Sequence, residues 1–199
     1  GVGSVPLSGG ETPFPYSGND TLEGKVPAPG QWYGIPLGDR FTPHHEVMAY
    51  CQQIAKLSPR VLVQKYGRSA EGRDLVLVMI STASNIARLD EIRAAQQLLA
   101  DPRRLAEREE LDLDTLLADL PAVVWLSYNV HGDESSGTEA ALATIHQLAD
   151  GSDQMIRQIR ENCLVIIDPL LNPDGRERYL HWYQQVQARP ANPDPAAAE

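Results

Sequence analysis

The sequence has little cysteine, little positive charge and no long apolar run. Its two cysteines, Cys51 and Cys163, are too few for a disulfide framework, and both fall in apolar patterns, so we predict buried free thiols. The 17 Lys and Arg against 27 Asp and Glu give a formal net charge of −10, which argues against nucleic-acid binding because that function needs a basic surface. No apolar stretch approaches the length of a membrane span. These absences leave a globular chain of 199 residues, long enough to bury a sizeable core.

Proline and glycine are concentrated at the start of the chain. The prolines there include Pro13, Pro15, Pro27, Pro29 and Pro36. Because proline interrupts helices and strands, we expect an extended arm over residues 1–40 and a folded domain over residues 41–199. The chain starts with neither an initiator Met nor a secretory signal, so we expect a processed chain or part of a longer one.

Helix and strand patterns alternate through the rest of the chain. Thr42 is predicted to cap a first helix with Pro43 at its first position, and Asn85 to cap a later one. Helices are predicted over residues 42–57, 85–100, 102–120, 135–150, 153–162 and 178–187. Strands are predicted over residues 60–66, 75–80, 122–130 and 163–168, of which the first two form a hairpin. This alternation predicts an α/β fold.

An imidazole and a carboxylate directly follow the predicted strand at 122–130. His131 and Glu134 lie in a short loop before the next helix, at the edge of an α/β sheet where active sites collect. Zinc accepts imidazole nitrogens and carboxylate oxygens as ligands. The pattern therefore predicts two metal ligands, and the alternative is a surface loop with an incidental histidine and acids.

Two further polar segments have residue types that can carry chemistry. Residues 67–73 superficially resemble a phosphate-binding loop, but the Gly-Lys-Ser/Thr ending is absent and the segment joins two strands, so we reject nucleotide binding. Residues 172–175, Asn-Pro-Asp-Gly, follow the strand at 163–168. They are expected at the same sheet edge as His131, with a plain tight turn as the alternative.

Taken together, four segments in order resemble the zinc metallocarboxypeptidase family, of which carboxypeptidase A is the best-known member. The helix from Thr42 with the strand from Ser58 resembles the family's opening helix and strand. Residues 66–73 resemble its Gly-x-Ser-x-Glu-Gly-Arg turn. His131-Gly132-Asp133-Glu134 resembles its His-x-x-Glu zinc motif, and residues 172–175 match its Asn-Pro-Asp-Gly motif. The resemblance covers roughly residues 40–180.

This resemblance implies a mixed, mostly parallel sheet flanked by helices, incomplete in this chain. Zn²⁺ would be held by His131, Glu134 and a later histidine, and a metal-activated water would hydrolyse peptide bonds at the C-terminus of peptides. A downstream Glu would be the general base. An arginine after Asn-Pro-Asp-Gly would hold the oxyanion, and Arg178 is the first choice over Arg176 and Arg189. A downstream Asn-Arg pair and a Tyr would grip the substrate carboxylate.

The chain departs from this pattern at the third ligand. His44 and His45 are expected to be solvated, and His146 to point away from the apolar face of its helix. His181 is the remaining alternative. No Asn-Arg dipeptide follows Gly175. We therefore expect the third ligand and the general base beyond Glu199, a chain that is inactive alone, and self-association through an exposed sheet edge.

Two alternatives to a carboxypeptidase stay open. The first is a zinc deacylase or amidase on the same fold, and the Asn-Arg pair that would grip a substrate carboxylate is the feature that decides between the two. The second is a catalytically dead module that binds peptides. The family resemblance also favours a secreted or periplasmic location.

Overall fold

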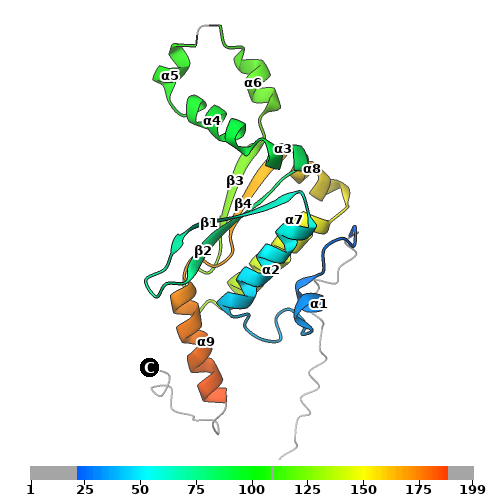
Figure 1. Cartoon of the computed structure of the whole chain (residues 1–199), viewed down its shortest axis with the longest axis vertical. Helices are drawn as coiled ribbons and strands as arrows, with labels where there is room; N and C mark the ends of the chain where they lie inside the picture. The colour runs from blue at the N-terminus through cyan, green and yellow to red at the C-terminus, as the bar shows by residue number, and fades with distance from the viewer. Residues whose placement is uncertain (1–21, 109, 188–199) are drawn as a thin grey trace, which may run out of the picture.

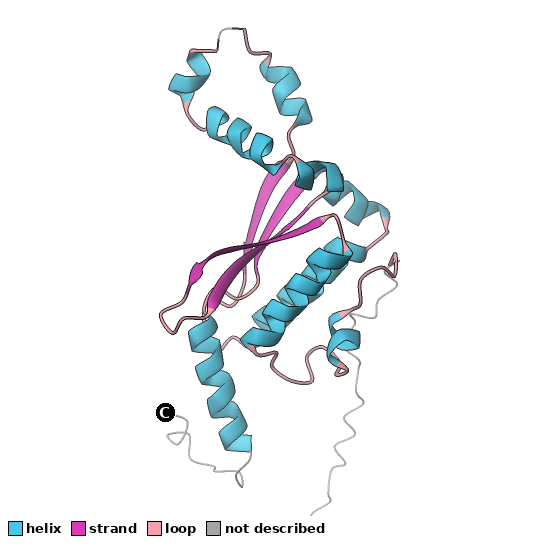
Figure 2. Cartoon of the chain, viewed as in Figure 1, coloured by secondary structure: helices cyan, strands magenta, loops and turns pink. Residues whose placement is uncertain are grey.

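In the computed structural model, residues 22–108 and 110–187 are described. Helices and strands alternate along them and build a sheet with helices on both faces (Figures 1 and 2). In chain order the elements are α1 (Pro29–Tyr33), α2 (His44–Leu57), β1 (Val61–Arg68), β2 (Asp74–Ile80), α3 (Ala83–Ala87), α4 (Leu89–Leu99), α5 (Pro102–Ala106), α6 (Leu113–Asp119), β3 (Ala122–Ser127), α7 (Ser136–Asp150), α8 (Gln154–Asn162), β4 (Cys163–Asp168) and α9 (Pro173–Gln187).

The sheet is mixed, as predicted, with the strand order β1-β2-β4-β3. The short turn between β1 and β2 forces them to run antiparallel, and β2 pairs with β4 antiparallel as well. Only β3 and β4 pair in parallel among the described strands, because α7 and α8 form the crossover between them. The expectation of a mostly parallel sheet is thus corrected: the parallel part is limited to the pair that carries the predicted site.

Helices α2 and α7 cover one face of the sheet (Figure 1), and the main core lies between these helices and the strands. Val47 and Ile54 of α2 and Leu142 and Ile145 of α7 are fully buried there, because each recurs at helical spacing. They pack on alternate residues of the strands, such as Val78, Val165 and Ile167. Burying one such side chain contributes about 1.5–3 kcal/mol.

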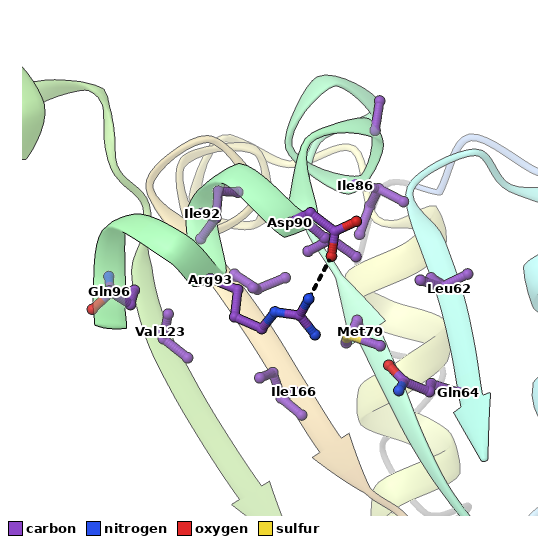
Figure 3. Close-up of a pocket in the computed structure, with 13 residues that line it drawn as sticks. Leu62, Gln64, Met79, Ile86, Asp90, Ile92, Arg93, Gln96, Val123 and Ile166 are labelled. Carbon is purple, nitrogen blue, oxygen red and sulfur yellow. Dashed lines mark ion pairs between the residues drawn. The ribbon is translucent and has the colours of Figure 1, made fainter. Parts of the chain in front are cut away.

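The opposite face is only partly covered, by α3 and α4. Met79, Ile92 and Leu164 form a small second core there. Beside it lies a groove of about 440 Å³, lined by apolar strand residues and by the Asp90–Arg93 ion pair of 3.0 Å (Figure 3). Neither predicted metal ligand lines this groove, so it is separate from the candidate site.

Two predicted helix starts are wrong for identifiable reasons. The residue that precedes α2 is Pro43, not Thr42, because the Thr42 hydroxyl donates instead to Glu139 Oε2 at 2.7 Å. Asn85 lies inside α3, which is capped by Thr82. Its buried side chain donates to Ser81 Oγ at 3.0 Å.

The described part of the N-terminal arm lies on α7. Leu22 forms an isolated bridge with Gly151, and the Asp150 carboxylate accepts the backbone N–H of Lys25 and Val26 at 2.9 and 3.1 Å. Val26 is part of the main core. The boundary at residue 40 stays a prediction.

Both cysteines are free, as predicted. Cys51 is buried and burial raises the pKa of its thiol to about 12, whereas Cys163 is only half-buried. Within the described residues, no helix combines the length and the apolar character needed to cross a membrane.

Candidate metal centre

The loop that carries His131 and Glu134 leaves the sheet at the carboxyl end of β3. Its first residue is tied to the neighbouring strand, since Tyr128 N–H donates to the Asp168 carbonyl at 2.9 Å. The chain then turns sharply at Asn129, whose φ is 55°. The loop ends where α7 begins at Ser136, so it joins a strand to a helix, as the sequence predicts. The strand itself is an edge strand with mostly exposed residues.

The side chains of His131 and Glu134 are both exposed. Their backbones form a tight turn in which Glu134 N–H donates to the His131 carbonyl at 3.2 Å. Among residues 22–108 and 110–187, neither side chain makes a hydrogen bond or an ion pair. An imidazole and a carboxylate that are three residues apart and not otherwise engaged are chemically suited to bind a metal.

Asn129 joins the backbones of these two residues. Its Nδ2 donates to the carbonyl of His131 at 2.9 Å and to that of Glu134 at 3.1 Å. The residue is 4% exposed, and its Oδ1 is buried without a hydrogen-bond partner in the described part of the chain. A buried acceptor left unpaired costs about 1–3 kcal/mol, so the loop is held at some expense in stability.

Asn172 links the loop to α9. Its N–H donates to the Asn129 carbonyl at 3.1 Å and its Nδ2 to the Val130 carbonyl at 3.2 Å. Its Oδ1 accepts Gly175 N–H at 2.9 Å, which caps a helix that starts at Pro173. The expected turn at 172–175 is therefore the first turn of α9. Its position at the same sheet edge as His131 is confirmed, because β3 and β4 run parallel and Asn172 bonds to the loop at Val130.

Glycine is required where the loop meets this helix. A Cβ atom at position 132 would lie 2.1 Å from the carbonyl carbon of Gly175 and 2.4 Å from the nitrogen of Arg176. Any residue other than glycine at position 132 would push the loop away from α9. The close approach thus explains the glycine inside the His-x-x-Glu motif.

A buried ion pair lies beneath the loop. Arg176, 1% exposed, donates through Nη2 to Glu139 Oε1 at 2.5 Å, through Nη1 to the Ser135 carbonyl at 2.9 Å and through Nε to the Thr42 carbonyl at 3.0 Å. Thr42 N–H also donates to Glu139 Oε1 at 2.8 Å. Burial lowers the pKa of Arg176, and the charge of Glu139 opposes that change. The pair connects α7, α9 and the start of α2, and it also holds the carbonyl of Ser135, the residue after Glu134.

The turn between β1 and β2 packs on the start of α9 through Asp174. This carboxylate accepts Ser69 Oγ–H at 2.7 Å, Glu71 N–H at 3.0 Å and Arg73 Nη1–H at 2.7 Å. Desolvation raises the pKa of Asp174, but these hydrogen bonds outweigh it and the pKa lies below its ordinary value. The predicted hairpin turn is therefore a structural partner of the Asn-Pro-Asp-Gly segment.

Arg178, the predicted oxyanion residue, pairs with Glu71 of the same turn. Its Nε donates to Glu71 Oε1 at 2.9 Å and its Nη2 donates to the same oxygen. The side chain is 71% exposed. Arg176 is committed to its buried contacts and Arg189 lies outside the described residues, so Arg178 stays the candidate.

None of the other histidines joins His131. His44 is half-buried rather than solvated, with its Nε2 2.8 Å from the Asp74 carbonyl, and His45 is exposed. His146 does not point outward but is buried 3.1 Å from the Val26 carbonyl, and His181 contacts Gln185 at 2.8 Å. In the part of the chain that the structure describes, no three His, Cys, Asp or Glu side chains are grouped to hold a metal.

Three residues around the loop escape sequence reasoning. Asn129 could have been found as a residue that tolerates positive φ just after a strand, and Glu139 as an acid in the apolar stripe of a helix. Asp168, at the end of β4, is buried and accepts Tyr66 O–H at 2.6 Å and Leu170 N–H at 3.2 Å. Burial raises its pKa above the ordinary value.

These features define an α/β domain with two ligand-type side chains at the carboxyl end of its parallel strand pair. The model of the zinc carboxypeptidase family (Peptidase_M14) matches residues 47–194, and the chain belongs to this family. No curated protein matches it.

Two solved structures illustrate the likeness. Carboxypeptidase A from Helicoverpa armigera is 27% identical over 73% of this chain and 27% of that chain, with a TM-score of 0.49. Thrombin activatable fibrinolysis inhibitor is 14% identical over 82% of this chain and 31% of that chain, with a TM-score of 0.52. The second likeness concerns the fold alone. The chain spans less than a third of the length of either structure.

Proposed function

We propose that His131 and Glu134 are two zinc ligands of a peptidase that cleaves the C-terminal residue of peptides. The observation that carries this proposal is the state of the two side chains. Both are exposed and unpaired within the described residues, on a loop whose backbone is fixed by Asn129, Asn172 and the contact between Gly132 and Gly175. Membership of the zinc carboxypeptidase family supports the same assignment.

The two side chains, an imidazole and a carboxylate, are suitable zinc ligands but do not make a complete site. One imidazole and one carboxylate are ligands found in catalytic zinc sites, which use three protein ligands and keep one position open. Zinc bound there would polarise the scissile carbonyl and lower the pKa of a water molecule. We infer that the third ligand and the general base come from outside residues 22–108 and 110–187, so the described part is inactive alone.

Arg178 is proposed as the residue that stabilises the oxyanion. Its Nη1 makes no hydrogen bond within the described residues, whereas Nε and Nη2 are bound to Glu71. Glu71 would thus orient the guanidinium and leave one nitrogen to donate to a substrate oxygen. Because the side chain is largely exposed, a bound peptide would have to exclude water from it.

A zinc deacylase or amidase and a peptide-binding module without turnover are the competing functions. In a protein that also supplies the third ligand and the general base, a substrate pair separates them: one peptide with a free C-terminal carboxylate and the same peptide amidated. A carboxypeptidase needs the free carboxylate, an amidase does not, and a binding module cleaves neither.

Zinc binding is the first test of the proposal. The chain is dialysed against a zinc buffer, and bound zinc is measured by elemental mass spectrometry. We expect less bound zinc in His131→Asn and in Glu134→Gln, and unchanged zinc in His45→Asn, the matched control at another exposed histidine. Equal zinc in all four proteins would refute the assignment.

Self-association is proposed through β3, which lies at the edge of the sheet. Val123, Val124 and Trp125 are exposed along it, Trp125 by 56%, and an uncovered apolar edge favours pairing with another strand. Sedimentation of a concentration series tests this, and a monomer at all concentrations would contradict it. The secreted or periplasmic location stays a prediction.

A further inference from the structure

We propose that Asn129 is the positioning residue of the metal loop, holding the backbones of His131 and Glu134 at the spacing at which their side chains bind one ion. This inference rests on the proposed zinc site. The Asn129 side chain would pre-organise the loop without touching the metal or the substrate.

The hydrogen bonds of the Asn129 carboxamide carry the argument. A single Nδ2 group uses its two protons on the carbonyls of the two proposed ligands, at 2.9 and 3.1 Å. Since only the amide nitrogen can donate, these bonds also fix which way the amide faces. Aspartate and alanine at this position have no such donor. The loop would then keep its internal backbone bonds from Glu134 N–H to the His131 carbonyl at 3.2 Å and from Ser135 N–H to the Asp133 carbonyl at 2.8 Å, but it would lose the one side chain that joins the two proposed ligands.

The backbone conformation and packing of Asn129 favour asparagine at this position. Its φ of 55° lies in the left-handed region, which among non-glycine residues asparagine tolerates best. Its nitrogen lies 3.2 Å from where a Cβ at position 137 would be, so the first turn of α7 packs directly on it. Its Oδ1 is buried and unpaired within the described residues. Strained and under-satisfied residues of this kind cluster at functional sites.

Contacts from α9 complete the restraint from the other side. Asn172 binds the carbonyl of Val130 at 3.2 Å, and Gly132 lies against Gly175. The loop backbone is thus held by Asn129 from inside the loop and by Asn172 from α9. The side chains of His131 and Glu134 make no hydrogen bond or ion pair among the described residues. Such a loop needs little reorganisation to bind an ion, and residues that orient ligands typically contribute 10–100-fold to metal affinity.

A zinc titration of the whole chain tests the proposal. The His131 ring signals are followed by NMR as zinc ion alone is added, and His131→Asn identifies them. In Asn129→Gly, glycine keeps the left-handed backbone accessible and removes the amide. We expect its zinc dissociation constant to rise at least about tenfold.

Asn85→Gly is the matched control. Asn85 is also a buried asparagine, 6% exposed, and its Nδ2 donates to Ser81 Oγ at 3.0 Å, but it lies in α3, away from the loop. We expect a change of less than about twofold in its dissociation constant, since a general loss of stability does not alter ligand orientation. Equal affinity of Asn129→Gly and the wild type, or equal weakening in both variants, would overturn the proposal.

Metal-free hydrogen exchange separates this inference from the zinc assignment. We expect faster exchange of the Glu134 and Gly137 amides in Asn129→Gly and no change there in Asn85→Gly. If the wild type binds no zinc at His131, the proposed function fails for this chain. The positioning role is then judged by exchange alone, and unchanged exchange in Asn129→Gly overturns it.

Discussion

Replacing Arg176 with methionine should be among the most destabilising single changes near the candidate site. The substitution keeps the volume of the side chain but removes three donors, to Glu139, Ser135 and Thr42, at distances between 2.5 and 3.0 Å. It leaves the Glu139 side chain, 10% exposed, as a buried carboxylate without its cation. Breaking a buried pair in this way costs about 3–5 kcal/mol.

Arg178→Met is the control in the same helix. Arg178 also pairs with a glutamate, but its side chain is 71% exposed, and exposed pairs contribute about 0–1 kcal/mol. The free energy of unfolding of each variant is measured by urea denaturation, followed by far-UV circular dichroism. Similar losses in the two variants would refute the account of a buried pair that joins α2, α7 and α9.

Adding Glu139→Leu to Arg176→Met tests the origin of the loss. The double variant removes both charges of this pair, and apolar replacements of a buried pair are often nearly neutral. We expect it to recover part of the stability of Arg176→Met. The recovery stays incomplete because Thr42 N–H and Oγ–H lose their acceptor. No recovery at all would place the cost in lost packing instead.

Three further predictions concern titratable groups other than the candidate ligands. Hydrogen bonds from Arg60 and Lys25 lower the pKa of Glu23 to about 2. Glu23→Gln should therefore lose about 1 kcal/mol in urea unfolding at neutral pH, and the loss should fade as the pH falls from about 4.5 to about 2. Because burial raises the pKa of Asp168, its charged form destabilises the fold above that pKa, so Asp168→Asn should gain stability relative to the wild type as the pH rises towards neutral. The Cys51 thiol, with its pKa raised to about 12, should react with a thiol reagent at mildly alkaline pH only as fast as the protein unfolds.

The elements of this fold were predictable where local pattern and packing agree. The apolar run of β2, the strand of β4 and the short helix α8 all follow from residues that act within a few positions of one another. Thr42 and Asn85 were misassigned because their side chains serve distant or buried partners, Glu139 and Ser81. Such a choice between a local cap and a tertiary contact cannot be read from the local sequence.

The sequence is enough to propose the two candidate ligands, which stay a prediction, but not to find the residues that support their loop. His131 and Glu134 are visible as a chemical pair after a strand, and the start of α9 was expected beside them. The residues that hold the loop cannot be recognised in the sequence. Asn129 acts through backbone carbonyls, and Arg176 acts through a glutamate 37 positions away. The mostly parallel sheet failed for a similar reason: β2 pairs with β4 across more than eighty residues of sequence, and nothing local sets its direction.

The most direct test of the zinc assignment is the position of the ion itself. Crystals of the chain grown with zinc are measured on both sides of the zinc absorption edge, and the anomalous difference map is calculated. We predict a peak within zinc-ligand distance, about 2.0–2.2 Å, of the His131 imidazole and the Glu134 carboxylate, with any further ligand coming from water or from outside residues 22–108 and 110–187. Zinc found only at other side chains such as His44 or His45, with none at His131, would contradict the account.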